Sequence, residues 1–220
     1  MISIILPTKN EEKNILNAIR GLQNLRKEKL CEIILVDGMS IDRTIEIACQ
    51  YVDKIIISEP NRGMQMNKGA EIAIGETLLF LHADTDISKN NCIRDISNTY
   101  NWGFFKLSFD KKDMKYTILS FLINLRSILF NYGTGDQVIF IKKKLFKKFG
   151  GFPNFEIMED IHFCSKLKKH FRPMILKSYV ITSARRWEIH GFLGTIFKMR
   201  ILRLLYYLKI QPSKLNSYYK

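Results

Sequence analysis

The chain has 220 residues, of which 46% are hydrophobic and 25% charged, a composition typical of folded proteins and unlike that of disordered ones. Its formal net charge is +14, and the charge is uneven: residues 1–100 hold 12 Lys and Arg against 14 Asp and Glu, whereas residues 101–220 hold 23 against 7. The basic half indicates either an anionic partner (nucleic acid, phosphorylated substrate or membrane surface) or a basic face that meets only solvent.

Buried-strand and amphipathic-helix patterns alternate along the first hundred residues. We expect strands at 3–6, 32–36, 54–58 and 77–82, and helices at 11–25, from Ser40 or Asp42 to Tyr51, at 62–74, and from Ser88 to about Tyr100. This alternation predicts an α/β fold with a mostly parallel central sheet and helices on both faces.

The second half is less regular. We expect strands at 102–109, 137–141 and 174–181, and helices at 114–130, 142–149, 158–170 and 192–210. No run approaches the ~20 apolar residues of a membrane span. Residues 101–220 therefore extend the same sheet and add a lid, and we predict a single domain over 1–220 in which 1–100 and 101–220 are two functional halves.

Four predicted strands of the first half end in polar loops. These loops are Pro7 to Glu11, Asp37 to Ser40, Glu59 to Arg62, and Asp84 to Asp86. Because ligands of such sheets bind beyond the carboxyl ends of the strands, the four loops together predict one binding site.

The last of these loops follows the apolar run Leu78–Leu81 and reads His82-Ala83-Asp84-Thr85-Asp86. Two carboxylates at this spacing suit a hard divalent cation, Mg²⁺ or Mn²⁺. The alternative is that either aspartate turns the loop or caps a helix, which is common for this residue. We expect His82 to be a packing residue and not a metal ligand.

Two further motifs lie in the basic half. Glu159 and Asp160 begin a predicted helix, where they either cap the helix N-terminus or supply a general base. Arg185, Arg186 and Trp187 form either a cation–π and phosphate-binding group or a surface pair of arginines packed on an aromatic ring.

The remaining signals concern the cell compartment and phosphate binding. The four cysteines lack the spacing of a zinc site, and we recognise no secretory signal, so we expect reduced thiols in a cytoplasmic protein. Neither GxxxxGK[ST] nor GxGxxG occurs, so a bound diphosphate would need a metal and basic side chains such as Arg62 and Lys68.

Taken together, the motifs resemble those of family 2 glycosyltransferases of the GT-A (Rossmann-like) fold over nearly the whole chain. They are Pro7-Thr8-x-Asn10-Glu11-Glu12, Val36-Asp37-Gly38-x-Ser40, Asp84-x-Asp86, Glu159-Asp160 and Arg186-Trp187. Further stretches, among them Gln65-Met66-Asn67, Gly135-Asp136-Gln137 and Gly150-Gly151-Phe152-Pro153, look like a short bacterial subgroup known as transferase 2, radical-SAM/selenodomain-associated.

The resemblance implies a role for each motif. A nucleoside diphosphate sugar, with UDP or GDP as its nucleotide, would be the donor. Pro7, Thr8, Asn10, Glu11, Asp37 and Ser40 would hold its base and ribose, and Arg62 and Lys68 would lie near the base or diphosphate. Asp84, with Asp86 as its partner, would bind the Mg²⁺ or Mn²⁺ that holds the diphosphate. Asp160, beside Glu159, would be the base of an inverting transfer to an acceptor hydroxyl, with Arg186 and Trp187 near the acceptor and the leaving diphosphate. Ser183 replaces the glutamine of the QxxRW motif, which argues against processive synthesis.

Three alternatives stay open at this point. A nucleotidyltransferase on a similar fold would release pyrophosphate. A non-catalytic RNA-binding or anionic-lipid-binding protein would explain the basic half but not the acidic loops, and no RNP-type motif or zinc knuckle is present. The basic, apolar segment 192–210 suits either a helix lying on the inner face of a membrane, near a lipid-linked acceptor, or a helix packed on the core.

Overall fold

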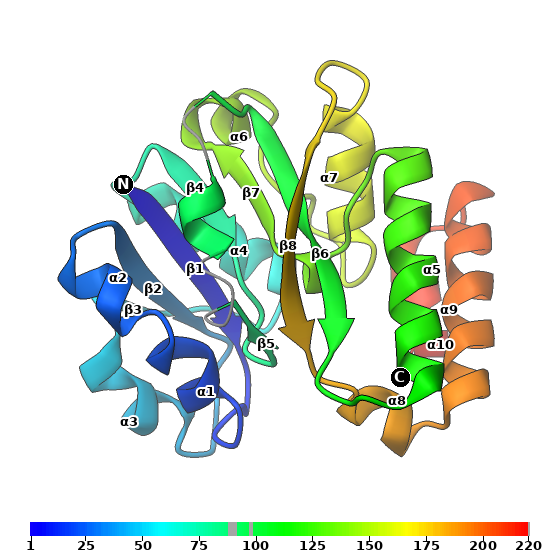
Figure 1. Ribbon diagram of the computed structural model, residues 1–220, viewed down its shortest axis with the longest axis horizontal. Helices are drawn as coiled ribbons and strands as arrows, with labels where there is room; N and C mark the ends of the chain where they lie inside the picture. Colours follow the sequence, from blue (N-terminus) through cyan, green and yellow to red (C-terminus); the bar gives the residue numbers. More distant parts are fainter. Residues whose placement is uncertain (88–91, 97–98, 220) are drawn as a thin grey trace.

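Strands from both halves of the sequence share one sheet. The computed structural model describes residues 1–87, 92–96 and 99–219, and in these residues the sheet has eight strands in the order β3-β2-β1-β4-β7-β6-β8-β5 (Figure 1). The strands are β1 (Ile2–Thr8), β2 (Cys31–Asp37), β3 (Lys54–Ile57), β4 (Thr77–Phe80), β5 (Thr85–Asp86), β6 (Trp102–Phe109), β7 (Ile139–Lys142) and β8 (Met174–Thr182).

Both parallel and antiparallel pairs occur in this sheet. β1, β2, β3 and β4 pair in parallel, as do β6 and β8, while β7 runs antiparallel between β4 and β6, and β5 runs antiparallel to β8. The prediction of a mostly parallel α/β sheet is therefore confirmed.

Helices cover both faces of the sheet. They are α1 (Ile15–Arg20), α2 (Gln23–Lys27), α3 (Thr44–Ala48), α4 (Arg62–Ile72), α5 (Met114–Phe130), α6 (Lys143–Lys148), α7 (Glu159–Leu167), α8 (Arg185–Ile189), α9 (Phe192–Tyr207) and α10 (Pro212–Tyr219). Short 3₁₀ turns lie at Cys49–Tyr51, Cys92–Asp95 and Gly135–Gln137.

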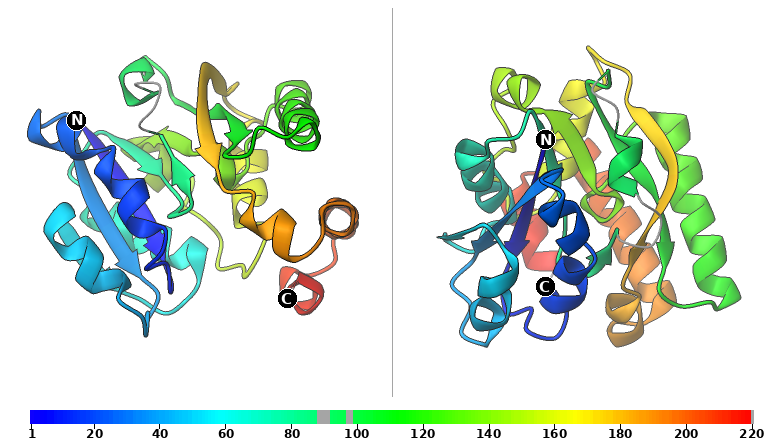
Figure 2. Two further views of the ribbon diagram at one scale, coloured as in Figure 1. Left: turned by 60° about the horizontal axis from the view of Figure 1, so that its bottom comes forward. Right: turned by 60° about the vertical axis from the view of Figure 1, so that its left-hand side comes forward.

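Alternate strand residues supply the two cores. Ile4 and Leu6 of β1 pack with α1 and α3 on one face, whereas Ile5 packs with α4 on the other, where α6, α7 and α9 complete the layer. This period of two is the expected consequence of the pleat of a strand buried on both sides. Figure 2 shows α5 and α9 as separate columns beyond the β6–β8 part of the sheet, with α10 beside α9.

Helix α5 covers part of β6 that β7 leaves open. β7 pairs only with residues 102–104 of β6. Farther along, the Asn124 side chain of α5 accepts a hydrogen bond from the Leu107 backbone amide (3.0 Å) and donates one to the Leu107 carbonyl (2.9 Å). A buried amide thus satisfies the backbone of β6, which fixes α5 against the sheet.

Some predicted elements differ from the structure. The predicted helix 11–25 is two helices, because the chain turns at Gly21 and Leu22 to bury Leu22 while the α2 residues stay half-buried or exposed. Of the helix predicted from Ser88, residues 88–91 and 97–98 lie outside the described residues, and the described part forms only the turn Cys92–Asp95. Helices α8 and α10 were not predicted. Cys31, Cys49 and Cys164 are free thiols.

Candidate active site

The ends of β1 and β2 form the first part of the site. The Asp37 carboxylate is fully buried there, and it accepts hydrogen bonds from the Thr8 hydroxyl (3.2 Å), the Ser40 backbone amide (2.7 Å) and the Ser40 hydroxyl (2.5 Å). Pro7, one residue before Thr8, is buried in β1 opposite Val36. The structure thus brings Thr8, Asp37 and Ser40 together as the sequence predicts.

The loop after β1 is fixed to the loop after β2. Asn10 has left-handed backbone geometry (φ 54°), donates its backbone amide to the Ser40 hydroxyl (2.8 Å) and accepts from the Ile41 amide (2.9 Å). Glu11 donates its amide to Thr44 (2.8 Å), and its carboxylate lies 3.7 Å from the Arg185 guanidinium. These contacts hold the loop after β1 against the loop after β2.

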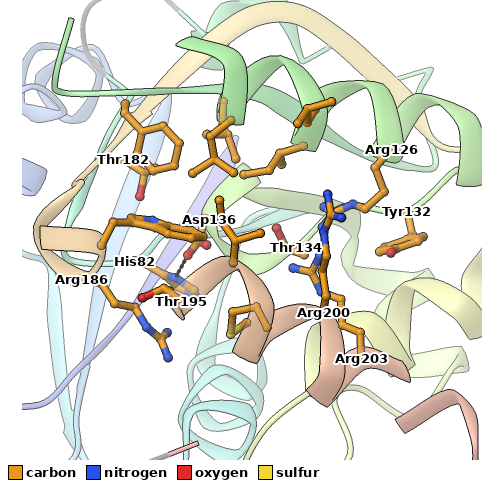
Figure 3. A pocket seen from close by; sticks show the side chains of 18 of the residues that line it. His82, Arg126, Tyr132, Thr134, Asp136, Thr182, Arg186, Thr195, Arg200 and Arg203 are labelled. Atoms are coloured by element: carbon orange, nitrogen blue, oxygen red, sulfur yellow. Dashed lines mark ion pairs between the residues drawn. The ribbon is translucent and has the colours of Figure 1, made fainter. Parts of the chain in front are cut away.

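A cavity of about 570 Å³ lies between the carboxyl-end loops of the sheet and helices α5 and α9 (Figure 3). Four predicted site residues line it: Arg62, Asp84, Arg186 and Trp187. They come from three separate segments of the chain, so the fold joins three of the predicted motifs in one cavity. Lys68 lies further along α4 and is not among the described residues that line it.

Asp84 and Asp86 differ in their surroundings. Asp84 lines the cavity, and its carbonyl accepts the Ser183 amide (3.1 Å), whereas Asp86 lies in β5, paired with Ile181 of β8. In the described residues, no group of three His, Cys, Asp or Glu side chains could hold a metal ion. The donor set fits Mg²⁺ or Mn²⁺ in the way usual for Mg²⁺ sites, with one or two carboxylates completed by diphosphate and water oxygens. Asp84 is the better placed of the two.

Glu159 and Asp160 begin α7, as the sequence predicts. The Arg62 guanidinium lies 2.6 Å from the Glu159 carboxylate, whose side chain is 1% exposed. Burial raises the pKa of Glu159, and the charge of Arg62 opposes that shift. The Asp160 carboxylate accepts the backbone amides of Gly135 and Ile161 (both 2.7 Å). Asp160 is mostly buried and is not among the described residues lining the cavity.

An unpredicted pair, His82 and Asp136, also faces the cavity. The His82 Nδ1 atom lies 3.5 Å from the Asp136 carboxylate, the pair drawn with a dashed line in Figure 3. Partial desolvation in the open cavity would raise the pKa of Asp136, whose side chain is 56% exposed, but the hydrogen bond and charge of His82, aided by Arg62 and Arg186, lower it to about 2. His82 packs tightly against Gly135, where an added Cβ would lie 2.3 Å from its ring. It is therefore a packing residue, as predicted, that also lines the cavity.

Trp187 packs among other aromatic rings. Its ring centroid lies 6.1 Å from those of Phe109 and Phe192. Helix α8 thereby anchors one wall of the cavity, and Arg186 extends from the same short helix.

Comparisons with known proteins fit this geometry. A family model described as Glycosyl transferase family 2 matches residues 3–117, slightly more than half of the chain. The chain belongs to glycosyl transferase family 2. A "PGL/p-HBAD biosynthesis glycosyltransferase" of Mycobacterium bovis is 25% identical over 226 residues, covering 93% of this chain and 84% of the relative. A "4,4'-diaponeurosporenoate glycosyltransferase" of Staphylococcus haemolyticus is 28% identical over 107 residues, 45% of this chain but only 28% of that protein.

Solved structures share the fold. The mannosyltransferase PcManGT from Pyrobaculum calidifontis, in complex with GDP-Man and Mn²⁺, has a TM-score of 0.68 at 17% identity, covering 93% of this chain and 61% of its own. S. aureus TarS 1-349, in complex with UDP-GlcNAc, has a TM-score of 0.66 at 23% identity, covering 83% of this chain and 58% of its own. The predicted GT-A (Rossmann-like) fold is confirmed. The bacterial subgroup stays a prediction.

Sequence reasoning missed several residues of the cavity. Asp136 was visible only as part of a Gly-Asp-Gln stretch, and Arg126 and Arg203 lie in helical segments that look like ordinary basic amphipathic helices. No local signal distinguishes them, because they meet only through the packing of α5 beside α9.

Proposed function

We propose that the protein is an inverting glycosyltransferase that moves a sugar from a nucleoside diphosphate sugar to an acceptor hydroxyl. The observation that carries this proposal is the single cavity lined by Asp84, Arg62 and Arg186 in a chain of glycosyl transferase family 2. One carboxylate and two guanidinium groups around one space suit a diphosphate, because a bound cation and basic side chains together neutralise its charge.

In the proposed reaction, Thr8, Asn10, Asp37 and Ser40 position the nucleoside, with Pro7 and Glu11 shaping the loop. Arg62 and Arg186 stabilise the negative charge that develops on the departing diphosphate. Asp84, with Asp86 near it, would hold Mg²⁺ or Mn²⁺, which supplies positive charge to the same oxygens. Lys68 has a lesser part, since it lies further along α4.

Asp160 is the proposed base. The acceptor oxygen attacks the anomeric carbon from the face opposite the diphosphate. The proton of the acceptor hydroxyl passes to the Asp160 carboxylate, and the bond between the anomeric carbon and the diphosphate oxygen breaks. Glu159 fixes Arg62 through their 2.6 Å contact. Trp187 lines the cavity and would lie near the acceptor. Positioning the two substrates accounts for much of the rate.

Helix α9, which lines one side of the cavity, has features of a membrane-contacting surface. Leu193, Phe197 and Leu204 of α9 are 77%, 68% and 59% exposed, and α9 also holds Lys198 and Arg200. In the described residues, no helix has the length and apolar character needed to cross a bilayer. We therefore propose peripheral contact with the anionic inner face of a membrane and a lipid-linked acceptor hydroxyl.

Nucleotide binding tests the donor part of the proposal. UDP-sugars and GDP-sugars, each with and without Mn²⁺, should raise the melting temperature only in the presence of metal, by an amount that grows with ligand concentration. Asp84→Asn should abolish this rise. Glu71→Gln, on the exposed side of α4, should leave it intact as a control for the loss of one negative charge. Stabilisation by polyanions alone would contradict the enzyme proposal.

The products separate the two enzyme classes. Incubation with the nucleotide sugar that binds should release a nucleoside diphosphate. Release of pyrophosphate would instead identify a nucleotidyltransferase.

A further inference from the structure

Three arginines lie at the end of the cavity away from His82 and Asp136 (Figure 3). Arg126 extends from α5, and Arg200 and Arg203 extend from α9. Arg200 and Arg203 are neighbours on one helix face, since they are three residues apart. Burial lowers the pKa of Arg126, and the nearby positive charge of Arg203 lowers it further, to about 10.

The protein leaves part of this charge without partners. The Nε and Nη1 atoms of Arg126 and the Nε atom of Arg203 are buried, and among the described residues they have no hydrogen-bond partner. Arg126 donates through Nη2 to Ser127 (3.1 Å) and Gln137 (3.4 Å), and its guanidinium lies over the Tyr132 ring at 5.1 Å. Buried donors without acceptors are costly, and two like charges together add to that cost.

The carboxylate whose charge affects Arg126 is that of Asp160, the proposed base. Its two oxygens already accept backbone amides from Gly135 and Ile161. Asp160 therefore offsets only part of the charge of the arginines. Because Asp160 is the proposed base, its effect on Arg126 indicates that the arginines lie near the point where an acceptor hydroxyl would lose its proton.

The same cavity also has many apolar lining residues. Leu107, Leu119, Ile123, Ile196 and Met199 are among them. A small hydrophilic anion would leave these side chains in contact with water, whereas a molecule with an apolar body would bury them.

We propose that Arg126 and Arg203, with Arg200 beside them, bind an oxyanion, best matched by a phosphate group, on an acceptor whose apolar part lies between α5 and α9. Guanidinium groups bind phosphate through paired, charge-assisted hydrogen bonds, which would satisfy the buried donors and remove the repulsion. That the bound molecule is the acceptor rests on the proposed function. The anion site itself does not, so it can be tested without sugar transfer.

Calorimetry with octyl phosphate, inorganic phosphate and octyl glucoside tests the site in the absence of nucleotide and metal. We expect octyl phosphate to bind about tenfold or more tightly than either of the others, because only it has both the anion and the apolar chain. Arg203→Gln and Arg126→Gln should each weaken octyl phosphate about tenfold or more. Arg172→Gln, an exposed arginine outside the cavity, should not weaken it.

Arg203→Gln keeps the test decisive if Arg126→Gln fails to fold. Equal affinity for octyl phosphate and octyl glucoside, or equal losses in Arg203→Gln and Arg172→Gln, would overturn the proposal. Displacement of octyl phosphate by UDP or GDP with Mn²⁺ would also overturn it, since the arginines would then bind the donor diphosphate.

Two further probes distinguish the source of the phosphate. Phosphatidylcholine vesicles with and without phosphatidic acid test a lipid acceptor, and glucose 6-phosphate tests a soluble one. An effect of Arg203→Gln on either probe supports the site, and no effect on both overturns it. If octyl phosphate binds while no nucleotide sugar does, the anion site stands and the proposed glycosyltransferase function fails.

Discussion

The two ends of the site differ in how their polar groups are satisfied. At the β1–β2 edge, the buried Asp37 carboxylate already has the Thr8 and Ser40 groups as donors. In the α5–α9 cavity, Arg126 and Arg203 retain buried nitrogen atoms without a partner among the described residues. The β1–β2 edge, the proposed nucleoside site, is therefore ordered by contacts within the protein, while the buried donors of the cavity suit the anion proposed to bind there.

This difference has an energetic side. A polar group that is satisfied internally contributes to folding, whereas a buried donor left without an acceptor reduces stability by about 1–3 kcal/mol.

The largest expected effect concerns Asp160, the proposed base. Asp160→Asn should lower kcat roughly 10²–10⁴-fold, because the amide cannot take the acceptor proton, while KM for the donor stays near its wild-type value. Steady-state kinetics measure both constants. Asp95→Asn, an exposed aspartate of the Cys92–Asp95 turn, is the matched control. A larger loss in Asp136→Asn than in Asp160→Asn would assign the base to Asp136, which faces the cavity.

The next effect concerns the ion pair between Arg62, which lines the cavity, and the buried Glu159. Arg62→Met should reduce the free energy of unfolding by about 2–4 kcal/mol, since it leaves the buried Glu159 without its cation. Because the pKa of Glu159 is raised above 4.5 in the folded protein, the stability linked to its protonation is present below pH 4.5 and lost as pH rises through the folded value. Urea unfolding should therefore show a smaller defect at pH 4 than at pH 7. The double variant with Glu159→Gln should recover most of the loss, and an unchanged defect there would contradict the role of the pair.

A smaller effect should appear on the exposed face of α9, the surface proposed to contact a membrane. Replacing the exposed Leu193 and Phe197 by Ser should weaken sedimentation with anionic vesicles several-fold. Each substitution removes apolar surface whose transfer from water into the membrane would stabilise binding by at most about 2 kcal/mol. The melting temperature should not change. Ile74→Ser, which is exposed just after α4, is the control. Equal sedimentation of all variants at low salt would argue against membrane contact through α9.

The smallest effect concerns the pair formed by the buried His82 and the exposed Asp136. The pKa of Asp136 is lowered from 3.8 to about 2, so its contribution to stability is present above pH 3.8 and lost as pH falls through 2. The Asp136 side chain is 56% exposed, and solvent therefore weakens the pair. Asp136→Asn should lower the melting temperature by about 1–2 °C near pH 5 and by less near pH 2. An equal difference at both pH values would show that the charge of Asp136 does not contribute.

The first region was the more predictable one, for a physical reason. Strands β1 and β2 are buried on both faces, and a polar loop follows each of these apolar runs directly, so Asp37 stands out in the sequence. The parallel arrangement then brings strand ends to one edge. The break between α1 and α2 escaped prediction because the apolar spacing continues through Leu22, and only tertiary burial turns the chain there.

The residues of the second region, the α5–α9 cavity, could not be predicted from the sequence in the same way. Arg126 and Arg203 lie 77 positions apart on helices whose patterns indicate only amphipathic surfaces. Their meeting depends on how α5 and α9 stand beyond the sheet, which no local pattern encodes. The same holds for Asp136, whose contact with His82 spans 54 positions.

The far position of β5 has a consequence for synthesis of the chain. Strands β1 to β4 pair with one another within residues 2–80, so they can assemble early on a growing chain. β5, which follows Asp84 directly, pairs instead with β8 at Thr182 and Ile181. A nascent chain that has not yet reached β8 would thus have its β1–β2 edge in place while β5, next to Asp84, still lacked its partner strand. Asp84 is therefore expected to be among the last residues of the proposed site to become fixed.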